Sequence, residues 1–385
     1  MRIHTRCRDD RGMVAAYVAF GLMAFLSASM LAIDVGMLMS ARAQAQNSAD
    51  AGALAGAVAL VFEDFDDRTA NSPAVQNAVM AARANEVMHD TVSVEPADVT
   101  FPSIERVRVR VQRTAIRGNP LSTLVASYFG TPTADIAAVA TAEAVPANAA
   151  TCIKPWAIPD KWIEMQTPAW DTSDESNMFY ENGPNKGLPL PNPDIYHPAT
   201  QANYTGYQQS PTGADYGLQV LLKPGNPGSA INPSQFFPIA LDGGTGAAWY
   251  ESNIPGCWPG EALLGNMMAV EPGNMTGPTK AGTVDLIAKD PNAYWDDAQQ
   301  RVVSSMHPSP RIIVLPVFDT YVYELGRQSG RIDIKIANFV GFFIEDVVGN
   351  DVRARIVPAM GLIRPNGGGG GVPNGAFLRA IRLVE

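Results

Sequence analysis

The sequence predicts an α+β protein: a single N-terminal transmembrane helix, a small membrane-proximal domain of helices and strands, and a β-rich ectodomain that is sandwich- or barrel-like. Residues 13–33 are apolar and uncharged, residues 34–145 change between helical and strand periods, and strand-like runs dominate after residue 311. The predicted parts are a cytoplasmic basic flank at 1–12, the transmembrane helix at 13–33, a membrane-proximal α+β domain at 34–148 and a β-rich extracytoplasmic domain at 149–385.

Composition and charge exclude some classes of function. The chain has 385 residues, of which 46% are hydrophobic, which is enough for two packed parts besides an anchor. The net charge of −10 argues against a nucleic-acid surface, because phosphate contacts need clustered Lys and Arg. The 34 glycines and 30 prolines suit a loop-rich, β-containing ectodomain better than a helical bundle.

The apolar run Met13–Ile33 is long enough to cross a bilayer, since about twenty helical residues span its hydrocarbon core. The first Lys or Arg after it is Arg42, whereas four arginines precede it: Arg2, Arg6, Arg8 and Arg11. The positive-inside rule therefore places the N-terminus in the cytoplasm and everything after Ile33 outside it. A cleaved signal peptide is the competing interpretation, but its apolar region would be shorter and followed by a small-residue cleavage site.

The helix is predicted to continue out of the membrane, because Val35–Phe62 contains no proline and is rich in Ala, Gln, Met and Leu. This continuity favours a retained anchor. Asp34 lies at the predicted boundary, where a carboxylate can reach water and needs no buried partner. A stripe of mostly small residues then recurs at spacings of three and four: Leu38, Ala41, Ala45, Ser48, Gly52 and Ala55. The stripe fits equally well against the chain's own second helix or against another subunit.

The rest of the membrane-proximal domain is predicted to hold one more helix near Pro73–His89, then a strand, a helix and a strand. Residues 104–115 alternate valine with arginine, which predicts a strand with one apolar and one cationic face. Pro120 begins a predicted helix that Gly130 ends, and residues 134–145 alternate again.

The second part of the chain begins at Cys152. Up to about Pro310 it is rich in aromatic residues and proline and has few periodic runs, with one helix predicted near Lys280–Lys289. After Arg311, turns such as Gly349–Asp351 separate four runs that are predicted as strands: RIIVLPVF, TYVYEL, RIDIKIANFVGFFIE and VRARIV.

Residues 34–60 read DVGMLMSARAQAQNSADAGALAGAVAL and follow an Arg-Gly pair and the apolar run. This segment resembles the N-terminal part of the TadE/TadG-like proteins of Tad (Flp) pilus assembly, whose pattern is RG, an apolar helix, D-x-G, an Arg, a Gln and an ADAAALAGA-like tail. The matching residues are Arg11, Gly12, Asp34, Gly36, Arg42, Gln46, Asp50, Ala51, Leu54, Ala55 and Gly56. The resemblance implies a pilus-assembly component in the bacterial inner membrane, whose partners are membrane lipid and other pilin-like or pilus-assembly membrane proteins.

The sequence departs from the family's patterns at two places, and the first of these departures favours a TadG-like protein over a processed pilin. Processed pilins of this system resemble G-x-x-x-x-E-Y at the cleavage site, but Tyr17 stands where the Glu would be expected. Some larger TadG-like proteins carry a von Willebrand A domain with a D-x-S-x-S motif, whereas the nearest string here, Asp171–Glu175, ends in Glu.

No motif for catalysis or for a cofactor is complete, so the protein is predicted not to be an enzyme and to have no small-molecule substrate. Gly367–Gly371 lacks the Lys-Ser/Thr of a P-loop, and no G-x-S-x-G elbow occurs. No metal ligands are predicted, because the four histidines (His4, His89, His197 and His307) lack ligand spacing and no C-x-x-C pair exists. Asp171–Asn177 begins like a calcium loop but lacks its glycine and terminal Glu, which favours a surface acidic loop.

The predicted topology also pairs the cysteines. Cys152 and Cys257 are the two on the extracytoplasmic side, where oxidation is possible, and Cys7 on the cytoplasmic side should stay a thiol. The sequence therefore predicts a disulfide between Cys152 and Cys257.

The sequence as a whole predicts a non-enzymatic component of Tad/Flp pilus assembly or a related envelope apparatus, which is anchored in the membrane and acts by protein–protein contact. The alternative hypothesis is a membrane-tethered adhesive or carbohydrate-binding module that uses exposed tryptophans.

Overall fold

The computed structural model describes residues 11–62, 68–165, 175–208, 215–242, 244, 246–306, 308–364 and 377–384. The chain forms two compact units. Of the described residues, the first unit contains 11–56, 68–142 and 383–384, and the second contains 57–62 and those between 143 and 382. The mixed α+β architecture, with a long apolar first helix followed by a β-rich region, confirms the predicted fold class.

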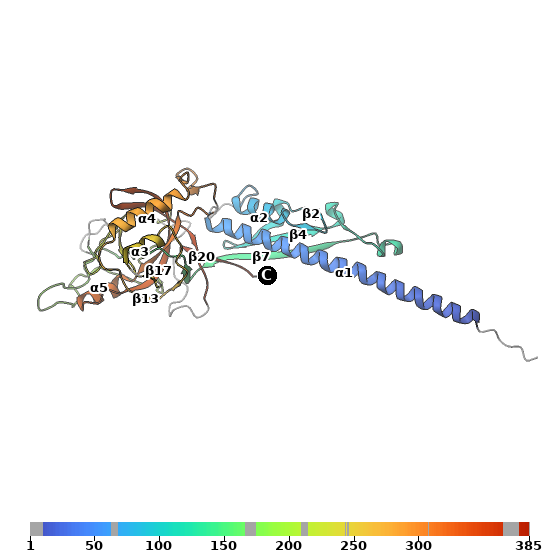
Figure 1. Cartoon of the computed structure of the whole chain (residues 1–385), viewed down its shortest axis with the longest axis horizontal. Helices are drawn as coiled ribbons and strands as arrows, with labels where there is room; N and C mark the ends of the chain where they lie inside the picture. Colours follow the sequence, from blue (N-terminus) through green and yellow to red (C-terminus); the bar gives the residue numbers. More distant parts are fainter. Residues whose placement is uncertain are drawn as a thin grey trace, which may run out of the picture. The chain divides into compact units, whose positions relative to one another are not determined.

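The elements of the first unit run in the order α1 (Arg11–Phe62), α2 (Pro73–Arg83), β1 (Glu86–Val87), β2 (Asp90–Thr91), η1 (Pro96–Asp98), β3 (Val99–Ser103), β4 (Arg106–Arg113), η2 (Ala115–Arg117), β5 (Leu121–Ser122), η3 (Ala126–Phe129), β6 (Thr133–Ala134) and β7 (Ile136–Pro146). The last turn of α1 and the end of β7 belong to the second unit. Figure 1 shows the second half of α1 alongside α2, β4 and β7.

The first helix is a single uninterrupted element of 52 residues, as the proline-free sequence predicts. The next helix, α2, begins where the Ser72 side chain accepts the amide of Val75 at 3.3 Å and proline follows at the first helical position. It ends at Arg83, so the helix is shorter than the predicted range of Pro73–His89. Met88 and His89 have positive φ angles of 55° and 64°, a conformation that a helix excludes but a tight turn between β1 and β2 requires.

The sheet of this unit confirms the strand with two different faces. Every second residue of β4 is buried and the arginines between them are exposed. The valine face packs on α1: a Cβ atom at Gly52 would lie 3.2 Å from Val109, and one at Gly56 would lie 2.9 Å from Val107. Glycine at these two positions lets helix and sheet approach closely.

The helix predicted from Pro120 to Gly130 is wrong. The segment is instead a short antiparallel pair, β5 with β6, whose loop contains the 3₁₀ turn η3. Gly130 caps that turn with a φ of 89°, and the amide of Thr123 donates to the Pro132 carbonyl across the hairpin at 3.0 Å. Leucine, valine and phenylalanine at helical spacing therefore did not form a helix here.

The elements of the second unit are β8 (Ala149–Thr151), β9 (Trp156–Pro159), β10 (Gln219–Pro224), β11 (Gln235–Pro238), α3 (Gly246–Asn253), β12 (Glu261–Leu263), β13 (Met267–Met268), α4 (Thr276–Ala288), β14 (Tyr294–Asp296), β15 (Arg301–Val303), β16 (Ile312–Phe318), α5 (Thr320–Gln328), β17 (Ile334–Val348), β18 (Asp351–Val357), β19 (Ala359–Met360) and β20 (Leu378–Leu383). The last residue of β20, Leu383, belongs to the first unit. The predicted helix near Lys280 is confirmed as α4, and three of the four predicted C-terminal strands are confirmed as β16, β17 and β18.

Six of these strands close into a barrel, in the order β17–β16–β9–β11–β10–β18 and back to β17. The β16–β17, β17–β18, β9–β11 and β10–β18 pairs are antiparallel, and β9–β16 and β10–β11 are parallel. One face of each of the six strands contributes to a single buried cluster that includes Trp156, Leu222, Phe236, Leu315, Phe342 and Ile356. A barrel interior filled with side chains of this kind is a packed core rather than a channel.

The fourth predicted strand, TYVYEL, is wrong because it forms helix α5. The Asp319 side chain caps this helix by accepting the amide of Val322 at 2.9 Å. Tyr323 and Glu324 face inward, whereas Tyr321 and Leu325 are exposed. The tyrosines and the valine have strand propensity, but the Asp319 cap and the burial of one side of the segment at helical spacing favour a helix.

Candidate functional site on the first helix

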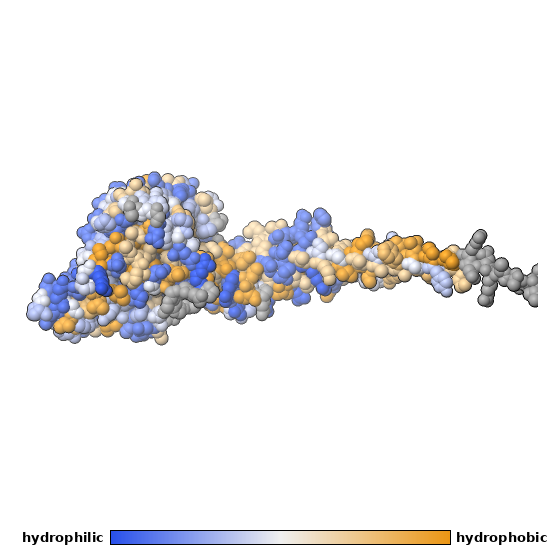
Figure 2. All heavy atoms as spheres, turned by 60° about the horizontal axis from the view of Figure 1, so that its bottom comes forward, coloured by the Kyte–Doolittle hydropathy of each residue, from blue (hydrophilic) through white to orange (hydrophobic). Residues whose placement is uncertain are grey.

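The first part of α1 presents apolar side chains on all sides. The described side chains from Met13 to Ile33 are exposed, including Tyr17 (72%), Phe20 (71%) and Phe25 (70%). In Figure 2 this stretch of the helix is mostly hydrophobic in colour, with some paler atoms among the orange ones. By length and composition α1 can cross a membrane, with a mean hydropathy of 2.0 in its most apolar window.

Asp34, directly after this apolar stretch, is not solvated as the sequence predicts. Its side chain is 3% exposed and its carboxylate accepts three backbone amides of the β5–β6 loop. The distances are 2.9 Å from Leu124, 3.0 Å from Val125 and 2.6 Å from Ala126. The amide of Ala126, with those of Leu124 and Val125, holds the pKa of Asp34 below its ordinary value, although burial opposes this. The expectation that Asp34 needs no buried partner is therefore wrong.

The stripe of small residues on α1 lies largely inside the first unit. Ala41, Ala45, Ser48 and Gly52 are buried, and Leu38 and Ala55 are half-buried. The Ser48 hydroxyl donates to the Ala82 carbonyl of α2 at 2.8 Å, and a Cβ at Gly52 would meet the Ala78 carbonyl oxygen at 2.9 Å. Of the two packing alternatives, the structure shows the contact with the chain's own second helix.

The polar residues of the TadE/TadG-like pattern tie α1 to its neighbours. The Gln46 amide donates to Asp50 at 2.8 Å and to the Val139 carbonyl of β7 at 3.2 Å. Arg42 and Gly36 are exposed. Of the remaining members, Gly56 is buried, and Ala51, Leu54 and Ala55 are half-buried. The burial of Arg11 and Gly12 is outside what the structure describes.

A disulfide joins Cys152 to Cys257 in the second unit, with 4.5 Å between their Cα atoms. Next to it, the Lys154 ammonium donates to the Gly256 carbonyl at 2.5 Å. Burial, with the nearby Lys289 charge, lowers the pKa of Lys154 to about 8. Cys7 lies outside the described residues.

A carboxylate that sequence reasoning missed is buried where β9 ends. Asp160 accepts the hydroxyls of Tyr196 at 3.1 Å and Tyr204 at 3.0 Å, and the amides of Lys161 at 3.1 Å and Tyr207 at 3.2 Å. Burial raises the pKa of Asp160 to about 7, against the opposing effect of these hydrogen bonds. No local signal marks it, because its three tyrosine partners come from a loop some forty residues further along the chain.

This raised pKa gives an expected pH dependence. The native state binds the Asp160 proton more tightly than the unfolded state, whose pKa is near 3.8, so stability falls as pH rises through the window from about 4 to about 7. We expect a loss of about 2–3 kcal/mol between pH 5 and pH 8 in urea unfolding. Asp160→Asn retains an acceptor for Tyr204 and offers Tyr196 a donor, so it should flatten this fall. An unchanged fall in the variant would assign the pH dependence to other groups.

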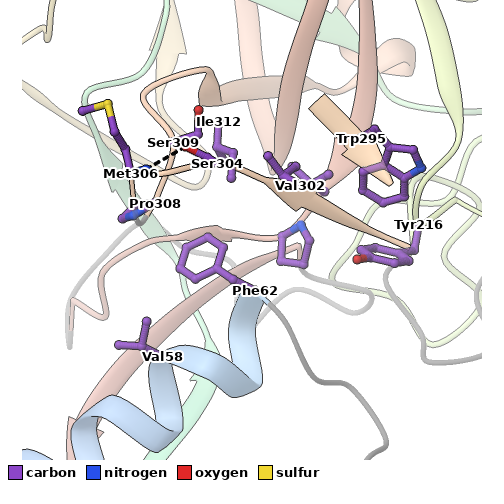
Figure 3. Close-up of a pocket in the computed structure, with 12 residues that line it drawn as sticks. Val58, Phe62, Tyr216, Trp295, Val302, Ser304, Met306, Pro308, Ser309 and Ile312 are labelled. Carbon is purple, nitrogen blue, oxygen red and sulfur yellow. Dashed lines mark hydrogen bonds between the residues drawn. The ribbon is translucent and has the colours of Figure 1, made fainter. Parts of the chain in front are cut away.

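Two cavities lie in the second unit. Val58 and Phe62, from the last turn of α1, line a cavity of about 70 Å³ with Tyr216, Trp295 and Met306 (Figure 3). This volume is well below the roughly 300–1,000 Å³ of typical ligand pockets. A cavity of this size is too small for a typical small-molecule ligand.

The larger cavity, of about 590 Å³, opens beside β10 and is lined by Lys161 and Arg353 together with apolar and polar side chains. Its two cations have partners within the chain: Lys161 pairs with Asp215 at 2.8 Å and Arg353 with Asp346 at 3.0 Å. Cations already neutralised in this way give the cavity little attraction for an anionic ligand.

The prediction that the chain has no metal ligands concerns residues of which the structure describes only some. Among the residues that the structure describes, no three His, Cys, Asp or Glu side chains gather as metal ligands. The acidic loop at 171–174, the glycine run at 367–371, His4 and His307 lie outside those residues.

The five tryptophans within the described ranges are not displayed for binding. Trp156, Trp162, Trp258 and Trp295 are at most 8% exposed, and Trp249 is half-buried. The carbohydrate-binding alternative relied on exposed tryptophans, and these five do not favour it.

Comparison with known proteins identifies one segment. Residues 12–59 match the family model described as putative Flp pilus-assembly TadE/G-like. The matched segment lies entirely within α1 and includes the apolar stretch, Asp34 and the stripe of small residues. Neither the curated proteins nor the solved structures provide a match.

Proposed function

We propose that the TadE/G-like segment at residues 12–59 makes this chain a membrane-anchored, non-enzymatic component of Flp pilus assembly that works by protein–protein contact. The main support for the proposal is that the matched segment lies entirely within α1. The same helix contains the apolar stretch, the pattern residues and the contacts with α2 and β4.

The proposed arrangement is a single-pass protein of the bacterial inner membrane with its N-terminus in the cytoplasm. The arginines before Met13 support this orientation through the positive-inside rule. The disulfide between Cys152 and Cys257 supports it independently, because disulfides persist in the oxidising space outside the cytoplasm. The second unit then lies in the periplasm or beyond it.

The proposed contact surface is the side of α1 that its own unit leaves uncovered just after the apolar stretch. Val35 is 42% exposed and Met39 is 67% exposed, whereas Ala41 and Ala45 are fully buried against the rest of the unit. Large apolar side chains on an otherwise packed helix suit contact with the helix of another pilin-like membrane protein.

Site-specific photocrosslinking in cells of the native host tests this contact. A photoreactive amino acid at Met39 should give a crosslinked product whose second component, identified by mass spectrometry, is a membrane protein of the same pilus system. The matched control is Val284 on α4, which is 50% exposed on the other unit and should give no such product. Crosslinks from Val284 alone would place the contact elsewhere, and products without any pilus component would contradict the proposed function.

A further inference from the structure

The β5–β6 loop of the first unit displays large apolar side chains to solvent. Tyr128 is 87% exposed, Phe129 is 76% exposed and Leu124 is 62% exposed. The sequence from Pro120 to Ala134 contains no charged residue. Exposed aromatic and aliphatic side chains clustered on an uncharged turn mark a surface that is covered in the working state.

Asp34 fixes where this turn lies along α1. Its carboxylate accepts the amides of Leu124, Val125 and Ala126 at distances of 2.6–3.0 Å. Asp34 follows Ile33, the last residue of the apolar stretch. The turn is therefore held beside the end of the segment that crosses the membrane, within the same unit.

Most backbone N–H groups of the turn are already hydrogen-bonded, so moving the turn from water into a less polar environment carries a small desolvation penalty. Asp34 satisfies three of its backbone donors, and the amides of Tyr128, Gly130 and Thr131 donate to carbonyls within the turn. The Thr123 hydroxyl donates to the Thr131 carbonyl. Unsatisfied backbone donors are the main obstacle to placing a loop in a lipid environment, and here the pairing removes most of that obstacle.

We propose that the turn from Leu124 to Phe129 inserts its apolar side chains into the interfacial region of the membrane that α1 crosses. Asp34 acts as the positioning residue. The occupant is lipid, because Asp34 holds the turn beside the end of the apolar stretch of α1. Tyrosine beside a membrane span suits the headgroup region, and phenylalanine and leucine suit the boundary between headgroups and acyl chains. This inference rests on the proposed anchoring by α1, and it gives the chain a second point of attachment that fixes the tilt of the first unit.

The test uses the full chain, with Cys7→Ser, in vesicles of phosphatidylcholine with or without phosphatidylglycerol. Single cysteines at Tyr128 and Phe129 receive an environment-sensitive fluorophore, while Cys152 and Cys257 stay paired in their disulfide. The control is Ile104, 59% exposed in the turn between β3 and β4, at the opposite end of β4 from the β5–β6 loop. Met30, within the apolar stretch, reports on the anchor itself.

We expect quenchers attached to shallow positions of the lipid to quench fluorophores at 128 and 129 several-fold more strongly than at 104. Because the turn carries no charge, the result should be the same without phosphatidylglycerol. Quenching at Met30 together with water-like values at 128 and 129 overturns the inference and indicates a protein as the occupant. If Met30 is also unquenched, the anchoring by α1 has failed instead.

Asp34→Ala separates positioning from simple apolar attraction. It should lower quenching at Phe129 towards the value at Ile104 and leave Met30 unchanged. Asp34→Asn retains one acceptor oxygen and should give an intermediate value, which a general loss of folding would not produce. Full quenching at Phe129 in Asp34→Ala would remove Asp34 from the proposal.

Discussion

Replacing Cys152 and Cys257 together by serine is expected to lower the free energy of unfolding of the second unit by about 4–5 kcal/mol. The two cysteines are 105 residues apart in the sequence, and a cross-link that closes a loop of this length strongly restricts the unfolded chain. A loss of this size is comparable to the net stability of many domains, roughly 5–15 kcal/mol. Urea unfolding followed by tryptophan fluorescence measures it, since Trp156 and Trp258 are buried close to the two cysteines in sequence.

The reductant provides the matched control. Dithiothreitol should destabilise the native chain to a similar extent and leave the double serine variant unchanged. Equal unfolding midpoints for the native chain with and without reductant would mean that the disulfide contributes little to stability.

Replacing Arg311 by methionine is expected to cost about 3–5 kcal/mol, because it breaks a buried network and leaves its acceptors unpaired. Arg311 is 3% exposed and lies before β16. Its guanidinium donates to four backbone carbonyls at 2.6–3.0 Å: those of Asp290, Ala293, Ile344 and Glu345. It also lies 4.8 Å from the centroid of the Phe343 ring. This one side chain therefore joins the segment that follows α4 to two positions on β17.

Arg353→Met is the comparison for this variant. Arg353 belongs to β18, which pairs with β17; 39% of its side chain is exposed, and it forms an ion pair with Asp346 at 3.0 Å. Exposed pairs contribute about 0–1 kcal/mol, so its unfolding midpoint should barely move. If Arg311→Met and Arg353→Met shift the midpoint equally, the buried carbonyl network is not what stabilises this part of the barrel.

The sequence predicts those elements whose pattern is local. The length of α1 follows from the absence of proline between residues 13 and 62. The two faces of β4 follow from its strict alternation, and β16, β17 and β18 follow from long β-branched and aromatic runs. The pairing of Cys152 with Cys257 follows from the predicted topology, which places only these two cysteines in an oxidising compartment.

What the sequence does not predict depends on partners far along the chain. Residues 120–130 have helical spacing, but a carboxylate some ninety residues earlier takes the amides that a helix would have paired internally. The TYVYEL run has strand propensity, but Asp319 caps it as a helix. The closing of six strands into a barrel depends on the β17–β18 and β9–β16 pairings. The sequence of a single strand does not determine the register in which it pairs with another.

The closed barrel has a consequence for how copies of this protein can meet. Each of its six strands has a hydrogen-bonded neighbour on both sides over at least part of its length, so little of their backbone is free to pair with an added strand from another chain. Donor-strand exchange, in which one subunit completes the sheet of the next, has little free strand edge to use here. Association through the barrel therefore relies mainly on side-chain contacts, which makes it easier to reverse and less prone to aggregation by strand pairing.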